Sequence, residues 1–446
     1  MSQPLSRQQH LDLYYFMQLN RQLEERMVRL FRQNKIVGGL YSSLGQEGVS
    51  VGTAYALEKR DWMAPMIRNI GALLVKGVPP RDIFTQHMAK YTSPTKGKDG
   101  TSHFGDLKNL HIVSPISMLG DLIPVMTGVA MGGRYLGQNI VAMTWIGDGG
   151  SSTGAFHEGL GLASSQRAPF VLIIENNQWA YSTPVSRQVP VKNLADRAVA
   201  YGIASTSVDG NDVVAVYRAA KEAVDECRAG RGPRIIEVKT MRMKGHAQHD
   251  PAEYVPKEMF EYWKARDPIA RYEKFLTEEK LWDAKTKTEL DTHIGNVLDK
   301  DQKFAEDSPL PPAETAETGV YCDGCHTIAA EWKRAKSDVT PPRASVDAVW
   351  KVPGFGALEA PPPNNGAKAA ASPAAAPAPA AAPAKAPAPA PAEAEIDAEA
   401  AASSAPDTPR VPFGRGPKDK AFLAEQQAKA PPPRHAQKHP PRKKGR

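Results

Sequence analysis

The middle of the chain alternates between short apolar runs and one segment of helical period. Residues 139–146 and 170–174 are apolar without polar alternation, which is typical of strands in a parallel sheet covered on both faces. Between them, Phe156, Leu160 and Ala163 recur at about helical spacing within residues 153–166. Strand, helix and strand in this order predict one right-handed crossover.

Similar patterns occur on both sides of this unit. Residues 234–241 predict another strand. Near the N-terminus, apolar residues at helical spacing predict a long first helix: Leu13, Phe16, Leu19, Leu23, Met27, Leu30 and Phe31. We therefore expect an α/β fold, a doubly wound parallel sheet with helices on both faces.

Glycines and hard oxygen ligands follow the two central strands. Residues 147–150 read Gly-Asp-Gly-Gly, and Asn177 ends the next strand. Ligands of such sheets bind beyond the carboxyl ends of the strands. The glycines let backbone amides approach a phosphate, helped by the N-terminus of the following helix, and Asp148 and Asn177 offer oxygens to Mg²⁺. The segment therefore predicts a site for a metal-bound diphosphate, and it does not fit the commoner phosphate loops.

The frame from residue 147 to residue 177 resembles the thiamin diphosphate motif. Three more segments narrow the resemblance: residues 45–48 (GQEG), 175–184 (ENNQWAYSTP) and 242–246 (RMKGH). Together they are similar to the α subunit of the decarboxylating first component of 2-oxo acid dehydrogenase complexes, of the pyruvate or branched-chain type. The likeness runs in order from the first helix to about residue 345, so we expect a thiamin diphosphate-binding catalytic domain at residues 1–345.

The resemblance assigns roles around the cofactor. Asp148 and Asn177 would bind Mg²⁺ through their side chains and Trp179 through its carbonyl. Arg68 would bind the diphosphate, for which a guanidinium fork is suited. The segment that holds the aminopyrimidine corresponds to Ser117 and Leu119. The remaining residues expected at the cofactor are Gly147, Gly149, Gly150 and His246.

Two histidines are implied as catalytic. His246 follows the strand at 234–241, matches the active-site histidine of the family, and could stabilise charge or transfer a proton near neutral pH. His103 occupies a similar position near the substrate. Ala247 stands where animal mitochondrial members have a serine after the histidine, so this chain cannot be phosphorylated there.

Some positions depart from the family. Met66 and Ile67 replace polar or aromatic residues before the arginine, which removes hydrogen bonds to the cofactor. Asp121 and Leu122 replace polar residues that hold potassium in branched-chain members, which favours pyruvate as substrate. Three alternatives to a pyruvate dehydrogenase α subunit remain: the α subunit of a branched-chain 2-oxo acid dehydrogenase, the α subunit of an acetoin dehydrogenase, and a non-catalytic scaffold.

The resemblance also implies partners. The acyl group of the oxidative decarboxylation would pass to a lipoyl acyltransferase component. The glutamate that activates the cofactor comes from a β subunit in two-chain members, and neither Glu47 nor Glu175 matches it. We therefore expect two α and two β subunits.

The composition of the chain limits the compartment and the partners that we expect. The chain has 446 residues, a formal net charge of +7 and three cysteines, with no apolar signal core and no run of eighteen apolar residues, so we expect a cytoplasmic protein without a membrane partner. Residues 352–446 form an alanine- and proline-rich linker with a basic end, which predicts a disordered tail and gives no reason to expect a nucleic-acid partner. Residues 322–326 (CDGCH) have the form of a haem attachment site, an alternative that requires export.

Overall fold

The computed structural model describes residues 4–36 and 38–319. The predicted domain boundary at residue 345, the tail at 352–446 and the cysteine pattern at 322–326 lie outside these residues. Among the described residues, no helix is both long and apolar enough to cross a bilayer.

Five parallel strands form the central sheet in the order β1-β2-β3-β7-β6. They are β1 (Trp62–Ala64), β2 (Ala142–Gly147), β3 (Phe170–Asn176), β6 (Ala204–Asp209) and β7 (Arg234–Lys239). The predicted α/β class and parallel sheet are therefore confirmed. The strand expected from residue 139 begins only at Ala142, because its partners begin there: Ala142 pairs with Trp62 and Phe170. The strand expected to reach residue 241 ends at Lys239, opposite the last residues of β3 and β6.

Helices surround the sheet. The helices are α1 (Arg7–Arg32), α2 (Glu47–Tyr55), α3 (Ile70–Lys76), α4 (Pro80–His87), α5 (Leu122–Tyr135), α6 (Gly154–Ser165), α7 (Val185–Gln188), α8 (Val213–Arg228), α9 (Lys257–Lys264), α10 (Pro268–Glu278) and α11 (Ala284–Asp307). Three 3₁₀ segments, η1 (Gly150–Ser152), η2 (Leu194–Tyr201) and η3 (Ala313–Ala316), and a two-stranded ribbon, β4 (Trp179–Ala180) with β5 (Thr183–Pro184), complete the described elements.

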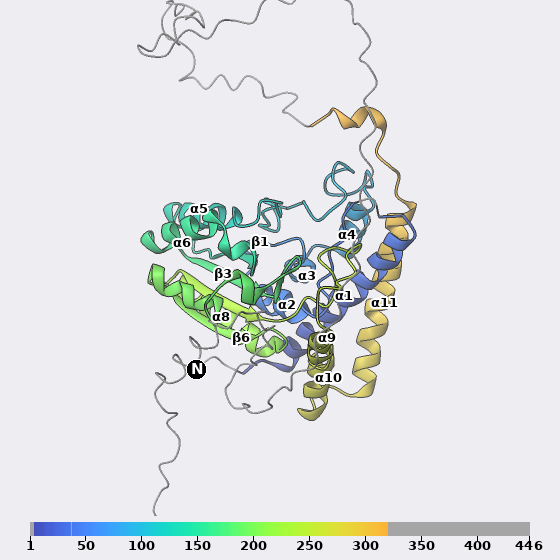
Figure 1. Cartoon of the computed structure of the whole chain (residues 1–446). Helices are drawn as coiled ribbons and strands as arrows, with labels where there is room; N and C mark the ends of the chain where they lie inside the picture. Colours follow the sequence, from blue (N-terminus) through green and yellow to red (C-terminus); the bar gives the residue numbers. More distant parts are fainter. Residues whose placement is uncertain (1–3, 37, 320–446) are drawn as a thin grey trace, which may run out of the picture. The chain divides into compact units, whose positions relative to one another are not determined.

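Alternate residues of the central strands enter two different cores. Met143 and Trp145 of β2 pack with residues of α1, α2, α3 and α8, whereas Ala142 and Ile146 pack with residues of α5, α6 and η2. Figure 1 shows α5 and α6 on one side of the sheet and α8 on the other. A strand buried on both faces needs apolar residues at every position, which explains the uninterrupted apolar runs in the sequence.

The predicted crossover helix is α6. Thr153 caps it by accepting a hydrogen bond from Phe156 N, and Gln166 ends it. The helix begins at Gly154 and ends at Ser165, as predicted within residues 153–166, and Gly150–Ser152 form a 3₁₀ turn before it. The helix N-terminus is therefore displaced from the Gly-Asp-Gly-Gly segment by one short turn.

The close packing of α6 on α5 gives a stability prediction. A Cβ at Gly159 would lie 2.7 Å from Ile123 Cγ2 and 2.8 Å from the Pro124 nitrogen, whereas a Cβ at Gly161 would have nothing within 4 Å. We expect Gly159→Ala to lower the free energy of unfolding by about 1–3 kcal/mol through overpacking. The matched control Gly161→Ala should raise it by up to about 1 kcal/mol, because alanine is the better helix former. Denaturant unfolding measures both, and equal effects would contradict this packing.

Candidate cofactor and metal site

The carboxyl ends of neighbouring strands place the predicted residues. Arg68 lies four residues after β1, and Asp148 directly follows β2. Asn177 directly follows β3, whose register with β2 pairs Gly147 with Glu175. His246 belongs to the segment after β7. The ends of parallel strands meet at one edge of a sheet, so these residues gather at the same edge.

The Asp148 carboxylate, the Asn177 amide and the Trp179 carbonyl converge at this edge. One terminal atom of the Asn177 amide lies 3.1 Å from Asp148 Oδ1 and 3.1 Å from the Trp179 carbonyl oxygen. If that atom is nitrogen, it donates to both oxygens. If it is oxygen, three oxygens face one another with no proton among them, which is favourable only around a cation. The Asn177 amide can thus satisfy itself without a cation and turn its oxygen inward when one binds.

The spacing of these atoms fits Mg²⁺. Neighbouring ligands of an octahedral ion with bonds of about 2.1 Å are about 3 Å apart. The donor set of one carboxylate, one amide and one carbonyl is also of the kind that Mg²⁺ takes together with substrate phosphates and water. Within the described residues, no group of three or more His, Cys, Asp or Glu side chains could hold a metal. These three residues therefore fit Mg²⁺ as the sequence predicted.

The second carboxylate oxygen of Asp148 is held by a neighbouring side chain. Gln188 Nε2 on α7 donates to Asp148 Oδ2 at 2.5 Å, which leaves Oδ1 toward Asn177. Burial raises the pKa of Asp148 to about 6, against the lowering effect of the Gln188 hydrogen bond. A divalent cation would favour the ionised carboxylate and so offset this penalty.

Arg68 and His246 are in direct contact. Arg68 Nη2 donates to the His246 carbonyl at 2.5 Å and lies 3.3 Å from His246 Nδ1, while Nη1 donates to the Ser42 carbonyl at 3.2 Å. Because a guanidinium can only donate, Nδ1 accepts and the neutral ring carries its proton on Nε2. Burial, together with Arg68 and Arg242, lowers the pKa of His246 to about 4, so the ring is neutral at pH 7. Burial likewise lowers the pKa of Arg68 to about 10, which still leaves it charged.

Arg242 connects the histidine segment with the Trp179 carbonyl. Its Nη1 donates to the Trp179 carbonyl at 3.3 Å, and its Nη2 donates to the Tyr254 hydroxyl at 2.7 Å. Asp250 in turn accepts from Tyr254 and from the His246 backbone N–H, both at 2.6 Å. The backbone of His246 and the carbonyl of Trp179 are therefore fixed by one hydrogen-bonded group.

The other predicted residues lie on neighbouring loops. Leu119 lines an apolar cleft with Met66 and Trp145. A Cβ at Gly150 would lie 2.4 Å from Ile146 Cδ1 and a Cβ at Gly149 2.5 Å from that of Ala180, so both glycines permit close packing, and Leu119 Cβ lies at ordinary contact distance, 3.5 Å, from the Gly150 position. No atom that would contact a side chain lies within 4 Å of a Cβ placed at Gly147.

Ser117 and His103 form a third group, with Ser117 Oγ 3.3 Å from His103 Nε2. Ser102 Oγ donates to the Ile67 carbonyl at 3.4 Å, which places the His103 loop against the segment of Arg68. The structure therefore brings the predicted residues together in three neighbouring groups, around Asp148, around Arg68 and around His103.

A family model described as "Dehydrogenase E1 component" matches residues 15–314. The chain belongs to this family. The predicted family, the thiamin diphosphate-binding fold and the class of oxidoreductase acting on 2-oxo acids are thereby confirmed, as is the family's dependence on thiamin diphosphate. The role of each residue and the presence of Mg²⁺ remain predictions.

Relatives of two kinds are similar to this E1 chain. The 2-oxoisovalerate dehydrogenase subunit alpha of Bacillus subtilis is 34% identical over 320 residues, covering 71% of this chain and 96% of the relative. The pyruvate dehydrogenase E1 component subunit alpha of Rickettsia felis is 30% identical, covering 71% and 97%. The pyruvate dehydrogenase E1 component subunit alpha of Staphylococcus aureus is 35% identical, covering 64% and 75%. These identities are too similar to distinguish pyruvate from branched-chain acids.

Three residues of the E1 site were not predicted from the sequence. Gln188 contacts Asp148, Arg242 contacts Trp179, and Gln46 Oε1 lies 3.3 Å from Asn177 Nδ2. Gln46 and Arg242 lie in segments that carried the family resemblance, so that signal could have found them. Gln188 stands in no such segment, and only the fold brings it to Asp148.

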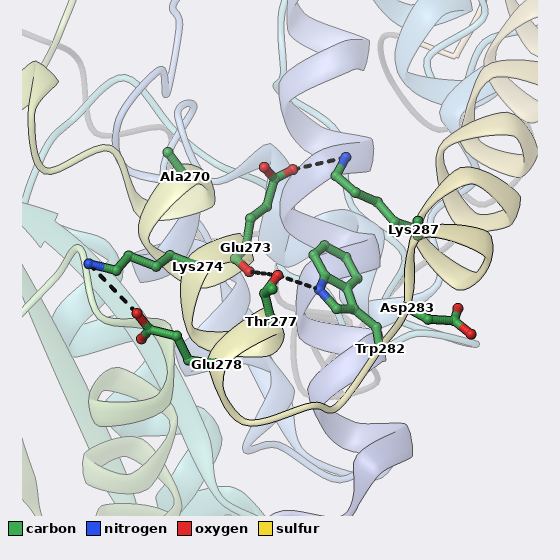
Figure 2. Close-up of a pocket in the computed structure, with 9 residues that line it drawn as sticks. Ala270, Glu273, Lys274, Thr277, Glu278, Trp282, Asp283 and Lys287 are labelled. Atoms are coloured by element: carbon green, nitrogen blue, oxygen red, sulfur yellow. Dashed lines mark hydrogen bonds and ion pairs between the residues drawn. The ribbon is translucent and has the colours of Figure 1, made fainter.

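Another pocket in the E1 chain, of about 600 Å³, lies between α10 and α11 and contains none of these residues. Figure 2 shows two ion pairs among its side chains: Lys287 points to Glu273 and Lys274 to Glu278. Trp282 Nε1 donates to Thr277. Four of its five charged side chains are therefore paired within the chain, and Asp283 accepts from the Thr286 backbone N–H.

The contact of Arg68 with His246 gives a prediction for the E1 site. In Arg68→Gln, we expect the pKa of His246 to rise from about 4 toward its ordinary value of about 6.5, because a positive neighbour that opposes protonation is lost. NMR titration of the ring in the cofactor-free chain measures this pKa. The control Arg271→Gln, whose guanidinium pairs with Asp209, should leave it unchanged. A wild-type value near 6.5 would show that the contact is not as described.

Proposed function

We propose that this chain is the α subunit of a thiamin diphosphate-dependent 2-oxo acid dehydrogenase that decarboxylates pyruvate oxidatively and passes the acyl group to a lipoyl group. The observation that carries the proposal is the convergence of the Asp148 carboxylate, the Asn177 amide and the Trp179 carbonyl after β2 and β3, together with the contact of Arg68 and His246. An anion bound through a cation and a guanidinium is the chemistry that such a site favours.

We assign the following roles to the residues of this chain. Asp148, Asn177 and the Trp179 carbonyl hold Mg²⁺, and Arg68 takes up negative charge of the diphosphate. When bound, thiamin diphosphate supplies the nucleophilic carbon and the electron sink for decarboxylation. His246, neutral and with its proton on Nε2, can donate a hydrogen bond to negative charge that develops on the substrate.

Neither of the two glutamates considered from the sequence is free to activate the cofactor, which supports a β-subunit partner. Glu47 pairs with Arg21 at 2.5 Å. Glu175 accepts from Asn69 Nδ2 at 2.5 Å. Both candidate carboxylates are thus already engaged with their own neighbours. We infer a complex of two α and two β subunits, with a lipoyl acyltransferase as the acceptor component.

Pyruvate is favoured over branched-chain acids by the start of α5. Leu122 packs into the second core, while Asp121 is exposed at the N-terminus of the helix. These two side chains do not converge on one ion, as the potassium site of branched-chain members would require. The acetoin dehydrogenase alternative shares the same cofactor site, and a non-catalytic scaffold would have no need of the oxygen ligands and the Arg68 contact.

We also propose residues 1–345 as the catalytic domain, residues 352–446 as a linker with a basic end, and the cytoplasm as the compartment. The family match over residues 15–314 supports the first statement, and composition supports the other two.

The substrate proposal predicts the outcome of a turnover assay. Chain copurified with its β partner should reduce an artificial acceptor with pyruvate, and only when thiamin diphosphate and Mg²⁺ are present. The isolated chain should be inactive. We expect kcat/KM to be highest for pyruvate in a panel that includes 2-oxoisovalerate and acetoin. A preference for branched acids or acetoin would replace pyruvate, and no turnover with the partner present would contradict the enzyme proposal.

The metal proposal predicts the effect of removing one ligand. Asp148→Asn should weaken Mg²⁺-dependent binding of thiamin diphosphate by at least about 10- to 100-fold, since losses of this size already follow from outer-shell changes at metal sites. Titration calorimetry with and without Mg²⁺ measures the affinity. The control Asp225→Asn changes an exposed carboxylate that pairs with Lys221, and should bind as the wild type does. Equal affinity for all three proteins would rule out Asp148 as a ligand.

A further inference from the structure

The loop of His103 contains a hydrogen-bonded series of side chains that the cofactor roles do not explain. Thr101 Oγ1 lies 2.9 Å from His103 Nδ1, and Asp99 Oδ2 lies 3.2 Å from the same nitrogen. On the other side of the ring, Ser117 Oγ lies 3.3 Å from Nε2. The order is therefore Asp99 and Thr101, then His103, then Ser117.

The positions of the protons follow from the contacts of Thr101. Its hydroxyl and its backbone N–H both donate to Asp99 Oδ1 at 2.6 Å. The only hydroxyl proton is thereby used, so Thr101 Oγ1 presents a lone pair to His103 Nδ1. Asp99 Oδ2 is also an acceptor. Two acceptors on Nδ1 require that this nitrogen carries the proton, which leaves a lone pair on Nε2 of the neutral ring.

Asp99 is charged in this arrangement. Burial alone would raise its pKa, but hydrogen bonds from Thr101 and His103 lower the pKa below its ordinary value. A carboxylate at Nδ1 also stabilises the imidazolium that forms when Nε2 gains a proton. The geometry therefore favours a histidine that accepts a proton at Nε2.

We propose that Asp99 and Thr101 are positioning residues that hold His103 in the Nδ1–H tautomer, so that His103 serves the site as a proton acceptor at Nε2 through the Ser117 hydroxyl. This inference rests on the proposed function and deepens it. Two contacts place the series at the site: Ser102 binds the carbonyl next to Arg68, and Leu119, two residues beyond Ser117, lies beside Gly150.

The proton balance is simple. His103 Nε2 takes the Ser117 hydroxyl proton while Ser117 takes a proton from a substrate hydroxyl or water hydrogen-bonded to it. The positive charge then resides on the imidazolium beside Asp99, and the negative charge on the donor oxygen. The reverse transfer restores both groups. No oxidant or reductant is involved.

The direct test is ¹⁵N NMR of histidine-labelled full-length chain without cofactor, with the His103 signals assigned by their loss in His103→Gln. In the wild type, at a pH at which the ring is neutral, we expect Nδ1 to carry the proton and Nε2 to carry none. In Asp99→Asn, an amide that can donate replaces a pure acceptor, so the Nδ1–H fraction should fall. The control Asp106→Asn alters a carboxylate of the same loop that binds Lys108 and Asn109 and should leave the tautomer unchanged.

The kinetic test uses the copurified enzyme. Asp99→Asn should lower kcat about tenfold or more, as expected for a weakened general base, with little change in KM or cofactor affinity. In a His103→Gln background the same change should have no further effect. An Nε2–H tautomer in the wild type, or additive losses, would overturn the proposal. The NMR result is independent of turnover, so an inactive enzyme with the expected tautomer would refute the proposed function and not the arrangement of His103.

Discussion

The parallel pairing of β2 with β3 is the constraint on which the site depends. Because Gly147 pairs with Glu175, Asp148 and Asn177 leave the sheet side by side at its carboxyl edge. The turn after β3 then brings the Trp179 carbonyl to the same point. A slip of one residue would exchange the two faces of β3 and send the side chains that fill one core into the other, so the packing of both cores also fixes the positions of Asp148 and Asn177.

Electrostatics explains why this edge suits a cation together with an anion. Asp148 is buried against two other oxygens, and its raised pKa records the cost of a charge without a cation. Arg68 and Arg242 are buried close by, with lowered pKa values, and burial together with these two charges keeps His246 neutral. A divalent cation compensates the oxygens, and a diphosphate compensates the arginines. The two groups of opposite sign thus favour one ligand, a metal-bound diphosphate.

The sequence was sufficient where one local pattern determines the structure. The apolar runs of β2 and β3 and the period of α6 follow directly from burial on two faces, and the positions of Asp148 and Asn177 follow from the strand ends. The contact of Gln188 with Asp148 and that of Asp99 with His103 could not be predicted in this way. Each depends on a short loop or a four-residue helix whose course is set by packing elsewhere. The 3₁₀ turn before α6 was missed for a different reason, because its hydrogen bonds are local to the glycines and leave no periodic signal.

The central claim is that Asp148, Asn177 and Trp179 hold a divalent cation that carries the diphosphate. Anomalous diffraction from crystals of the α and β complex with Mn²⁺ and thiamin diphosphate tests it most directly. The account predicts one manganese peak in contact with Asp148 Oδ1, Asn177 Oδ1 and the Trp179 carbonyl oxygen, and with oxygens of the diphosphate. A cofactor bound without a peak at these three oxygens, or a peak held by other residues, would contradict it.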